Sequence, residues 1–163
     1  MILVEVNIRG GEKEVRDILL DATNNFASQL MSKRMIDVLT VNIILIKGLF
    51  TKEQIYGDCT WEDQNYRPRE FTIRLDSRKN PFIPIKTLAH EMVHVKQFAR
   101  NELKDTMAGK QKWLGKTYDK VPYWELPWEI EANGRERGLI LRFLTETNRL
   151  DILKHKANVW EII

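Results

Sequence analysis

The segment Leu88-Ala-His-Glu-Met-Val-His-Val-Lys-Gln97 contains two of the three histidines of this 163-residue chain. His90 and His94 are four residues apart, so in a helix their side chains project from one face, one turn apart. At that spacing both imidazole nitrogens can reach a single zinc ion at roughly 2.0–2.1 Å. Glu91, beside the first imidazole, is the residue type that takes a proton from a water at such a metal. The segment therefore predicts a helix that carries a zinc site.

The predicted helix spans residues 85–101 and has apolar side chains, among them Leu88, Met92 and Val95, on its buried face. The two histidines lie on an adjoining polar stripe, where burial of an imidazole costs free energy unless the ring finds a partner. A metal ion supplies that partner, which favours the zinc interpretation. Two histidines held by ordinary hydrogen bonds are the alternative interpretation of the same pattern.

Three other segments have the residue pattern of β-strands. Residues 2–8 and 71–76 alternate between apolar and polar side chains, which is the period of a strand with one buried face. Residues 38–46 are rich in β-branched and apolar side chains, as is typical of a central strand. The polar, turn-rich stretch 48–68 is interpreted as a loop or an irregular hairpin.

Two further segments have helical spacing. Apolar residues recur every three or four positions over 12–35, and another helix is predicted from Pro127 to Leu144, since proline suits the first helical turn. The strands and helices together predict an α+β fold. The length of the chain favours a single domain over residues 1–163.

Composition narrows the classes of partner and of cellular location. The formal net charge is only +3 and basic residues alternate with acidic ones, which argues against nucleic-acid binding. Cys59 is the only cysteine, so a disulfide framework and a cysteine-based zinc ribbon are both excluded. Residues 1–9 are too short and too interrupted for a signal peptide or a membrane span. We expect a cytoplasmic protein with no membrane partner, and the sequence leaves its oligomeric state open.

A catalytic zinc site needs a third protein ligand besides the two imidazoles. Glu131 is the first choice, because Gly134 and Gly138 follow it on the same helical face and glycines there suggest the close approach of another helix. Glu129, on another face of that helix, is the second choice. His155, near the end of the sequence, is a further alternative.

Hydrolysis at such a site also needs a donor that stabilises a developing oxyanion. Tyr123, Tyr118 and His155 are candidates, and their spacing does not separate them. Glu136, together with Arg135, is expected either to hold a ligand imidazole in the correct tautomer or simply to be exposed to solvent.

The run His90-Glu-Met-Val-His94, followed by Trp128-Glu-Ile-Glu-Ala132, resembles the gluzincin group of zinc metallopeptidases. It is especially similar to small metallopeptidase-like proteins of bacteria and their phages. In that group a glutamate on a downstream helix, often followed by alanine as Glu131 is, completes the metal site. The resemblance covers roughly residues 71–144. It implies a minimal zincin-like fold, in which a small twisted mixed sheet packs on the motif helix and a second helix supplies the last ligand.

The resemblance also implies an activity, a Zn²⁺-dependent hydrolysis of the peptide bonds of a peptide or protein substrate with Glu91 as general base. In such folds the edge strand before the motif helix pairs with an extended peptide, and residues 71–76 are placed for that role. Arg135 departs from the pattern of thermolysin-type enzymes, which carry at that place an aspartate that orients a histidine.

Two alternative functions remain open at this stage. One is a zinc-stabilised regulatory or interaction protein that keeps the metal site without turnover. The other is a nucleic-acid-associated protease similar to SprT-like enzymes, which usually complete the site with histidine and often add a cysteine zinc ribbon.

Overall fold

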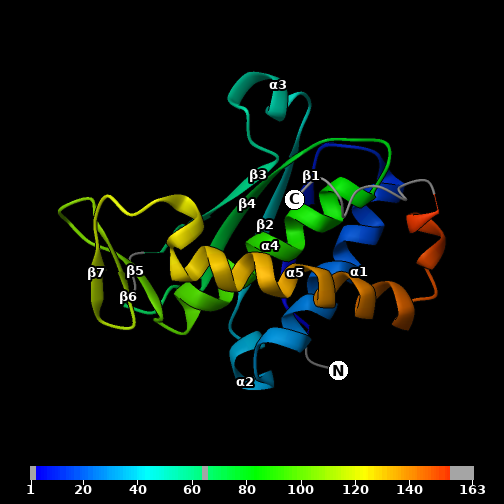
Figure 1. Cartoon of the computed structure of the whole chain (residues 1–163). Helices are drawn as coiled ribbons and strands as arrows, with labels where there is room; N and C mark the ends of the chain where they lie inside the picture. Colours follow the sequence, from blue (N-terminus) through cyan, green and yellow to red (C-terminus); the bar gives the residue numbers. More distant parts are fainter. Residues whose placement is uncertain (1–2, 64–65, 155–163) are drawn as a thin grey trace.

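The computed structural model of the chain describes residues 3–63 and 66–154, and within them a four-stranded mixed sheet is combined with five α-helices (Figure 1). The mixed α+β class predicted from the sequence is therefore confirmed. The strands follow one another across the sheet in the order β1-β2-β4-β3. Their bounds are β1 (Glu5–Arg9), β2 (Thr40–Ile46), β3 (Gly57–Trp61) and β4 (Glu70–Asp76). β1, β2 and β4 are parallel, whereas β3 runs antiparallel to β4 and forms an edge of the sheet.

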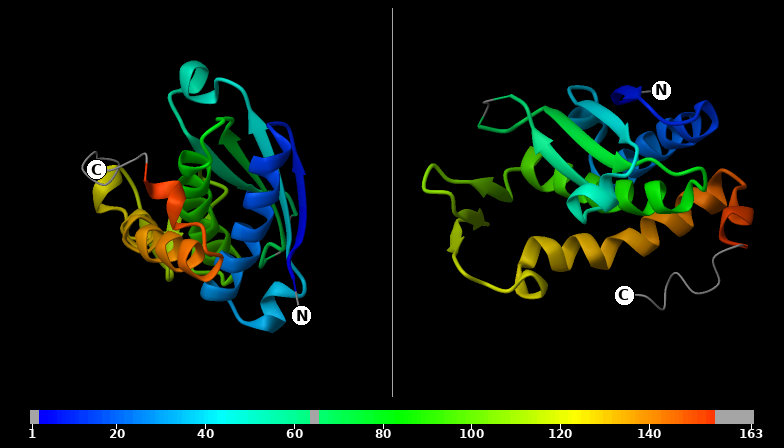
Figure 2. Two further views of the ribbon diagram at one scale, coloured as in Figure 1. Left: turned by 90° about the vertical axis from the view of Figure 1, so that its right-hand side faces the viewer. Right: turned by 90° about the horizontal axis from the view of Figure 1, so that it is seen from above.

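The helices cover one face of the sheet in two layers. Two helices, α1 (Lys13–Leu30) and α4 (Phe82–Ala99), pack directly on the sheet, and α5 (Pro127–Glu146) lies on α4 on the side away from it (Figure 2). The two short helices are α2 (Lys33–Ile36) and α3 (Leu49–Glu53). Because α4 lies between the sheet and α5, nearly its whole circumference is buried. Polar groups on α4 therefore need partners within the protein.

The core forms because the alternating side chains of the strands meet the apolar stripes of the helices. Phe71, Ile73 and Leu75 of β4 are completely buried beneath α4. Phe26 of α1 packs edge-to-face on Phe143 of α5, with ring centroids 5.6 Å apart, which links the outer helix to the inner layer.

A second, smaller sheet connects α4 to α5. It consists of three antiparallel strands of three residues each, β5 (Leu103–Asp105), β6 (Gln111–Trp113) and β7 (Lys116–Tyr118). The 3₁₀ turns η1 (Tyr123–Glu125) and η2 (Leu150–Leu153) stand before and after α5. Strands this short have too few residues to show a period, so the sequence pattern does not indicate them.

Two predicted segments differ from the structure. The helix expected over 12–35 is interrupted, because Met31 is extended and Ser32 starts the separate helix α2. The stretch 48–68, interpreted as a loop or hairpin, contains α3 and the edge strand β3. Gly57 and Asp58 have low strand propensity, so pairing with β4 rather than local preference forms this strand.

The predicted role of residues 71–76 as an edge strand is wrong. These residues form β4, which is hydrogen-bonded to β2 on one side and to β3 on the other. Alternation of side chains indicates a buried face but says nothing about the number of neighbours in the sheet. Among the described residues, no helix combines the length and the apolar character needed to cross a membrane.

Candidate metal centre

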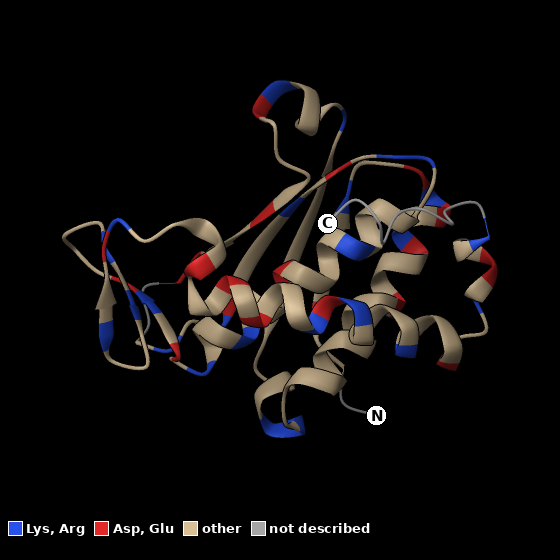
Figure 3. Cartoon of the chain, in the orientation of Figure 1, with Lys and Arg blue, Asp and Glu red and all other residues tan. Residues whose placement is uncertain are grey.

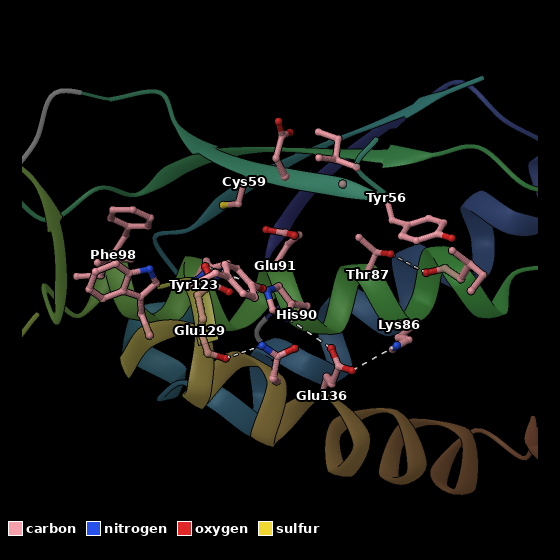
Figure 4. Close-up of a pocket in the computed structure, with 18 of the residues that line it drawn as sticks. Tyr56, Cys59, Lys86, Thr87, His90, Glu91, Phe98, Tyr123, Glu129 and Glu136 are labelled. Atoms are coloured by element: carbon pink, nitrogen blue, oxygen red, sulfur yellow. Dashed lines mark hydrogen bonds and ion pairs between the residues drawn. The ribbon is translucent and has the colours of Figure 1, made fainter. Parts of the chain in front are cut away.

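His90 and His94 lie one helical turn apart on α4 and both line the cleft between α4, β3 and α5. Figure 4 shows His90 on the side of α4 that faces this cleft. His90 Nε2 and His94 Nε2 are 3.2 Å apart, and the rings are nearly perpendicular, at 78°. Both side chains are mostly buried. The predicted helix and the predicted convergence of its two imidazoles are therefore present.

Glu129, in the first turn of α5, completes the group. Its Oε2 lies 3.2 Å from His90 Nε2, and its Oε1 lies 3.5 Å from His94 Nε2. Within the described residues these three side chains form the one group of at least three potential ligands whose donor atoms all lie within 4.8 Å of one another.

The donor atoms fit a zinc ion in both separation and chemistry. Bonds of about 2.0–2.1 Å in a tetrahedral arrangement put neighbouring ligand atoms roughly 3.3–3.4 Å apart, close to the separations observed here. Glu129 Oε2 is buried and, among the described residues, has no aligned hydrogen-bond donor, so this oxygen retains an unused lone pair. Two imidazole nitrogens and one carboxylate oxygen are also a common donor set of catalytic zinc.

Glu131, the first choice from the sequence, lies elsewhere. Its Oε1 accepts hydrogen bonds from Lys96 Nζ at 2.6 Å and from Arg135 Nε at 2.8 Å, and its Oε2 accepts one from Gln97 Nε2 at 2.9 Å. Two residues along an α-helix correspond to roughly 200° of rotation about its axis, so Glu129 and Glu131 project from nearly opposite faces of α5. The structure thus corrects the expected third residue of the group from Glu131 to the second choice, Glu129.

The glycine argument that favoured Glu131 is also wrong. Gly134 and Gly138 are exposed, and a Cβ built on either residue meets no atom within 4 Å among the described residues. Within the part of the chain that the structure describes, no helix therefore approaches closely at these positions, and α5 packs on α4 through another face.

Glu91 points from α4 into the space beneath β3, near Cys59 (Figure 4). Its side chain is only 7% exposed. Burial raises the pKa of this carboxyl, and the positive charge of the neighbouring imidazoles opposes but does not cancel that shift. A buried carboxylate beside these potential ligand atoms is suited to accept a proton.

The two imidazoles and Glu129 stabilise one another's charged forms. Burial lowers the pKa of His90, but its contacts with Glu129 and Glu136 outweigh this and raise the pKa to about 10. The pKa of His94 is also raised, because Glu129 and Glu91 more than offset the opposing effect of burial. Burial opposes ionisation of Glu129, yet the two imidazoles hold its pKa well below the ordinary value. The carboxylates thus attract positive charge to this point, whether as protons or as a cation.

Both imidazoles have a second partner at their Nδ1 atoms. His94 Nδ1 is 2.8 Å from Gln97 Oε1, and His90 Nδ1 is 3.4 Å from Glu136 Oε2. Glu136 is buried, which agrees with the first of its two predicted roles, but Arg135 pairs with Glu131 instead of joining it. Gln97 was not singled out from the sequence. Its signal is its position three residues after His94, on the same polar stripe.

Of the other predicted site residues, one lines the cleft, one packs elsewhere and one lies outside the described residues. Tyr123, in η1, lines the cleft beside Glu129, and burial together with that carboxylate raises its pKa to about 12. Tyr118 instead packs edge-to-face on Trp128, with ring centroids 5.5 Å apart, and does not line this cleft. His155 lies outside the described residues.

The centre opens into a cleft of about 790 Å³ bounded by β3, α4, α5 and η1. Tyr56 O accepts a hydrogen bond from Asp76 N at 2.7 Å, and Glu62 N donates one to Glu70 O at 2.8 Å. The backbone groups of Tyr56 and Glu62, which flank β3, therefore point toward β4. In an antiparallel pair the even-numbered residues between them also hydrogen-bond to β4. In an antiparallel pair the backbone groups of the odd-numbered residues 57, 59 and 61 then point outward, toward the cleft edge.

The chain matches no known protein family, and no curated protein and no solved structure is detectably similar to it. The residues and geometry of this cleft are consequently the basis for inferring its function.

Proposed function

We propose that this chain is a zinc-dependent metallopeptidase with a minimal zincin-like fold, in which His90, His94 and Glu129 hold Zn²⁺. The observation that carries the proposal is the convergence of two imidazole nitrogens, 3.2 Å apart, on one carboxylate: Glu129 Oε2 lies 3.2 Å from His90 Nε2, and Glu129 Oε1 lies 3.5 Å from His94 Nε2. The buried Oε2 lacks an aligned donor among the described residues. Structural zinc sites usually have four protein ligands, whereas catalytic sites have three and leave one position open. Three ligands at the floor of a cleft favour catalysis.

A bound zinc ion would act as a Lewis acid that polarises a substrate carbonyl and makes water more acidic. Glu91 would accept the proton of the attacking water and then deliver it to the leaving amine. Its raised pKa suits both transfers, since a general base works best when its pKa approaches the working pH. The Tyr123 hydroxyl, at the mouth of the cleft, would donate a hydrogen bond to the carbonyl oxygen as negative charge develops on it.

The outward backbone groups of Gly57, Cys59 and Trp61 favour an extended peptide as the substrate. An extended peptide can add to an exposed sheet edge through backbone hydrogen bonds, which need no particular side chains. β3 therefore takes the role that the sequence had suggested for residues 71–76. The cleft beneath it brings such a peptide past Glu91 and the metal ligands.

The alternative of a nucleic-acid-associated protease receives no support from the charges. Lys and Arg residues are spread over many elements and interspersed with Asp and Glu (Figure 3). Around the centre itself the charged groups are mainly carboxylates, those of Glu91, Glu129 and Glu136, which repel phosphate.

The proposal is tested with purified full-length protein loaded with one equivalent of zinc. Unstructured peptides of mixed sequence are incubated with wild type and with Glu91→Gln, and the products are identified by mass spectrometry. We expect wild type to cleave and the variant to keep its zinc but lose roughly 10²–10⁴-fold in rate, the usual contribution of a general base. Stoichiometric zinc without any cleavage would favour the non-catalytic zinc protein, and absence of zinc binding would refute the metal centre.

A further inference from the structure

We propose that Glu131 is a positioning residue that acts through Gln97 to hold His94 in the tautomer able to bind metal. This inference rests on the proposed function, because it concerns the same metal centre. It gives a role to the carboxylate that lies outside the ligand group, and to a glutamine that is completely buried.

The orientation of the Gln97 side-chain amide is fixed by its surroundings. Its Nε2 donates to the backbone oxygen of Trp128 and to Glu131 Oε2, both at 2.9 Å. A carbonyl and a carboxylate can only accept, so the NH₂ group must occupy this side. The amide oxygen, Oε1, is thereby directed to His94 Nδ1 at 2.8 Å.

The amide orientation determines where the imidazole proton sits. Because an amide oxygen only accepts, Nδ1 of His94 must carry a hydrogen. In the neutral ring Nε2 is then left with a free lone pair. That atom faces His90 Nε2 and Glu129 Oε1, where the metal would be held. A partner of this kind on the distal nitrogen fixes both tautomer and ring orientation.

Glu131 is itself held by two cations. Lys96 Nζ and Arg135 Nε both donate to Oε1, which leaves Oε2 for Gln97. Lys96 is buried and also pairs with Glu102 at 2.8 Å, so its ammonium group is fixed in place. The Oε1 position must therefore be occupied by an acceptor.

This asymmetry makes Glu131→Gln an informative variant. The new amide would direct its oxygen to Lys96 and Arg135, and its NH₂ group would face the NH₂ group of Gln97. Rotation of the Gln97 amide would relieve that donor–donor conflict, but it would set the amide oxygen against Trp128 O and turn an NH₂ group toward His94 Nδ1. The neutral ring would then place its hydrogen on Nε2, the atom required for metal binding.

The exchanged pair Gln97→Glu with Glu131→Gln provides a rescue. A carboxylate at position 97 can accept from His94 Nδ1 with one oxygen and from the new amide at position 131 with the other. This second oxygen also faces the backbone oxygen of Trp128, so the rescue is expected to be partial. Glu146→Gln is the matched control, because Glu146 also lies on α5 and pairs with the arginine four residues away, Arg142, but is remote from the centre.

The experiment measures zinc affinity by chelator competition, and the ¹⁵N shifts of the His94 ring in the metal-free full-length protein at a pH where the ring is neutral. For Glu131→Gln we expect zinc binding to weaken about 10–100-fold, the usual effect of losing a partner of a ligand, with the ring hydrogen moved from Nδ1 to Nε2. The exchanged pair should return the hydrogen to Nδ1 and recover part of the affinity. Glu146→Gln should resemble wild type in both measurements.

Unchanged affinity and an unchanged Nδ1 hydrogen in Glu131→Gln would overturn the positioning role. So would a loss of affinity that the exchanged pair leaves unrepaired while its thermal unfolding matches wild type. Failure of the metal centre itself is recognised separately, since His90→Ala and Glu129→Ala would then bind zinc as wild type does.

Discussion

Glu129 Oε2 lies 3.2 Å from Nε2 of His90, buried and without an aligned hydrogen-bond donor among the described residues. The carboxylate two residues later, by contrast, has three donors and belongs to another network. The two glutamates of the same helical turn are thus distinguished by their partners, and each of them gives a different expectation for metal binding.

Replacement of Glu129 by alanine is expected to abolish stoichiometric zinc, because it removes one of three protein ligands. Zinc affinity should fall by more than the roughly 10–100-fold typical of a residue that only supports a ligand. Glu131→Ala should still retain about one zinc per chain. Metal analysis after gel filtration measures both, and the reverse ranking of the two variants would exclude the assigned ligand.

The exposed glycines of α5 give a prediction for stability. Gly134→Ala and Gly138→Ala should each raise the free energy of unfolding by about 0.4–1 kcal/mol, because alanine favours the helix and a new Cβ meets no atom there. Urea denaturation of the zinc-free protein measures the change. A decrease in stability would mean that these positions are covered by something outside the described residues.

Gly57 gives the opposite prediction, since its surroundings are crowded. A Cβ at this position would lie 2.5 Å from the backbone oxygen of Arg74 and 2.6 Å from Thr87 Cγ2. Gly57→Ala must therefore displace β3 from both β4 and α4, and we expect a loss of stability of about 1–3 kcal/mol, as for overpacked sites. The same denaturation experiment applies, and the cleavage rate should fall as well because β3 bounds the cleft. An alanine variant as stable as wild type would contradict the close packing of β3 on α4.

Zinc binding should be linked to the release of protons. The pKa of His90, about 10 without metal, means that this ring carries a proton at neutral pH, and zinc must displace it. Apparent affinity should therefore rise with pH, about tenfold per unit for each proton displaced, as long as the pH is below that pKa. Chelator competition between about pH 6.5 and 8.5 measures the slope, and a flat profile would argue against His90 as a ligand.

Local spacing predicted the motif helix well, because four residues correspond to one turn and therefore to a known distance between side chains. The choice of third residue needed the rotation of α5 about its axis. Glu129, Ala132 and Glu136 share the face that packs toward α4, and the buried Ala132 between two acidic residues was the available signal. Two exposed glycines pointed to the wrong face, since low helix propensity has causes other than close packing.

The order of strands could not be predicted from any single segment. β3 forms from a polar stretch that begins with Gly57 and Asp58, and it is stabilised by pairing with β4, whose residues come later in the sequence. Such pairing is a tertiary interaction, so strand propensity gives little warning of it. The edge of the sheet was consequently assigned to β4, the strand that follows β3 in the sequence.

The antiparallel direction of β3 has a consequence for polarity of cleavage. A peptide that pairs antiparallel with β3 would travel from the Trp61 end toward the Gly57 end. Its amino-terminal half would then pass Phe98, Leu103 and Trp128, and its carboxyl-terminal half would pass the cationic groups of Arg78 and Lys86. This orientation would favour bulky hydrocarbon before the cut bond, whereas the charges of Arg78 and Lys86 are already paired with Asp76 and Glu136.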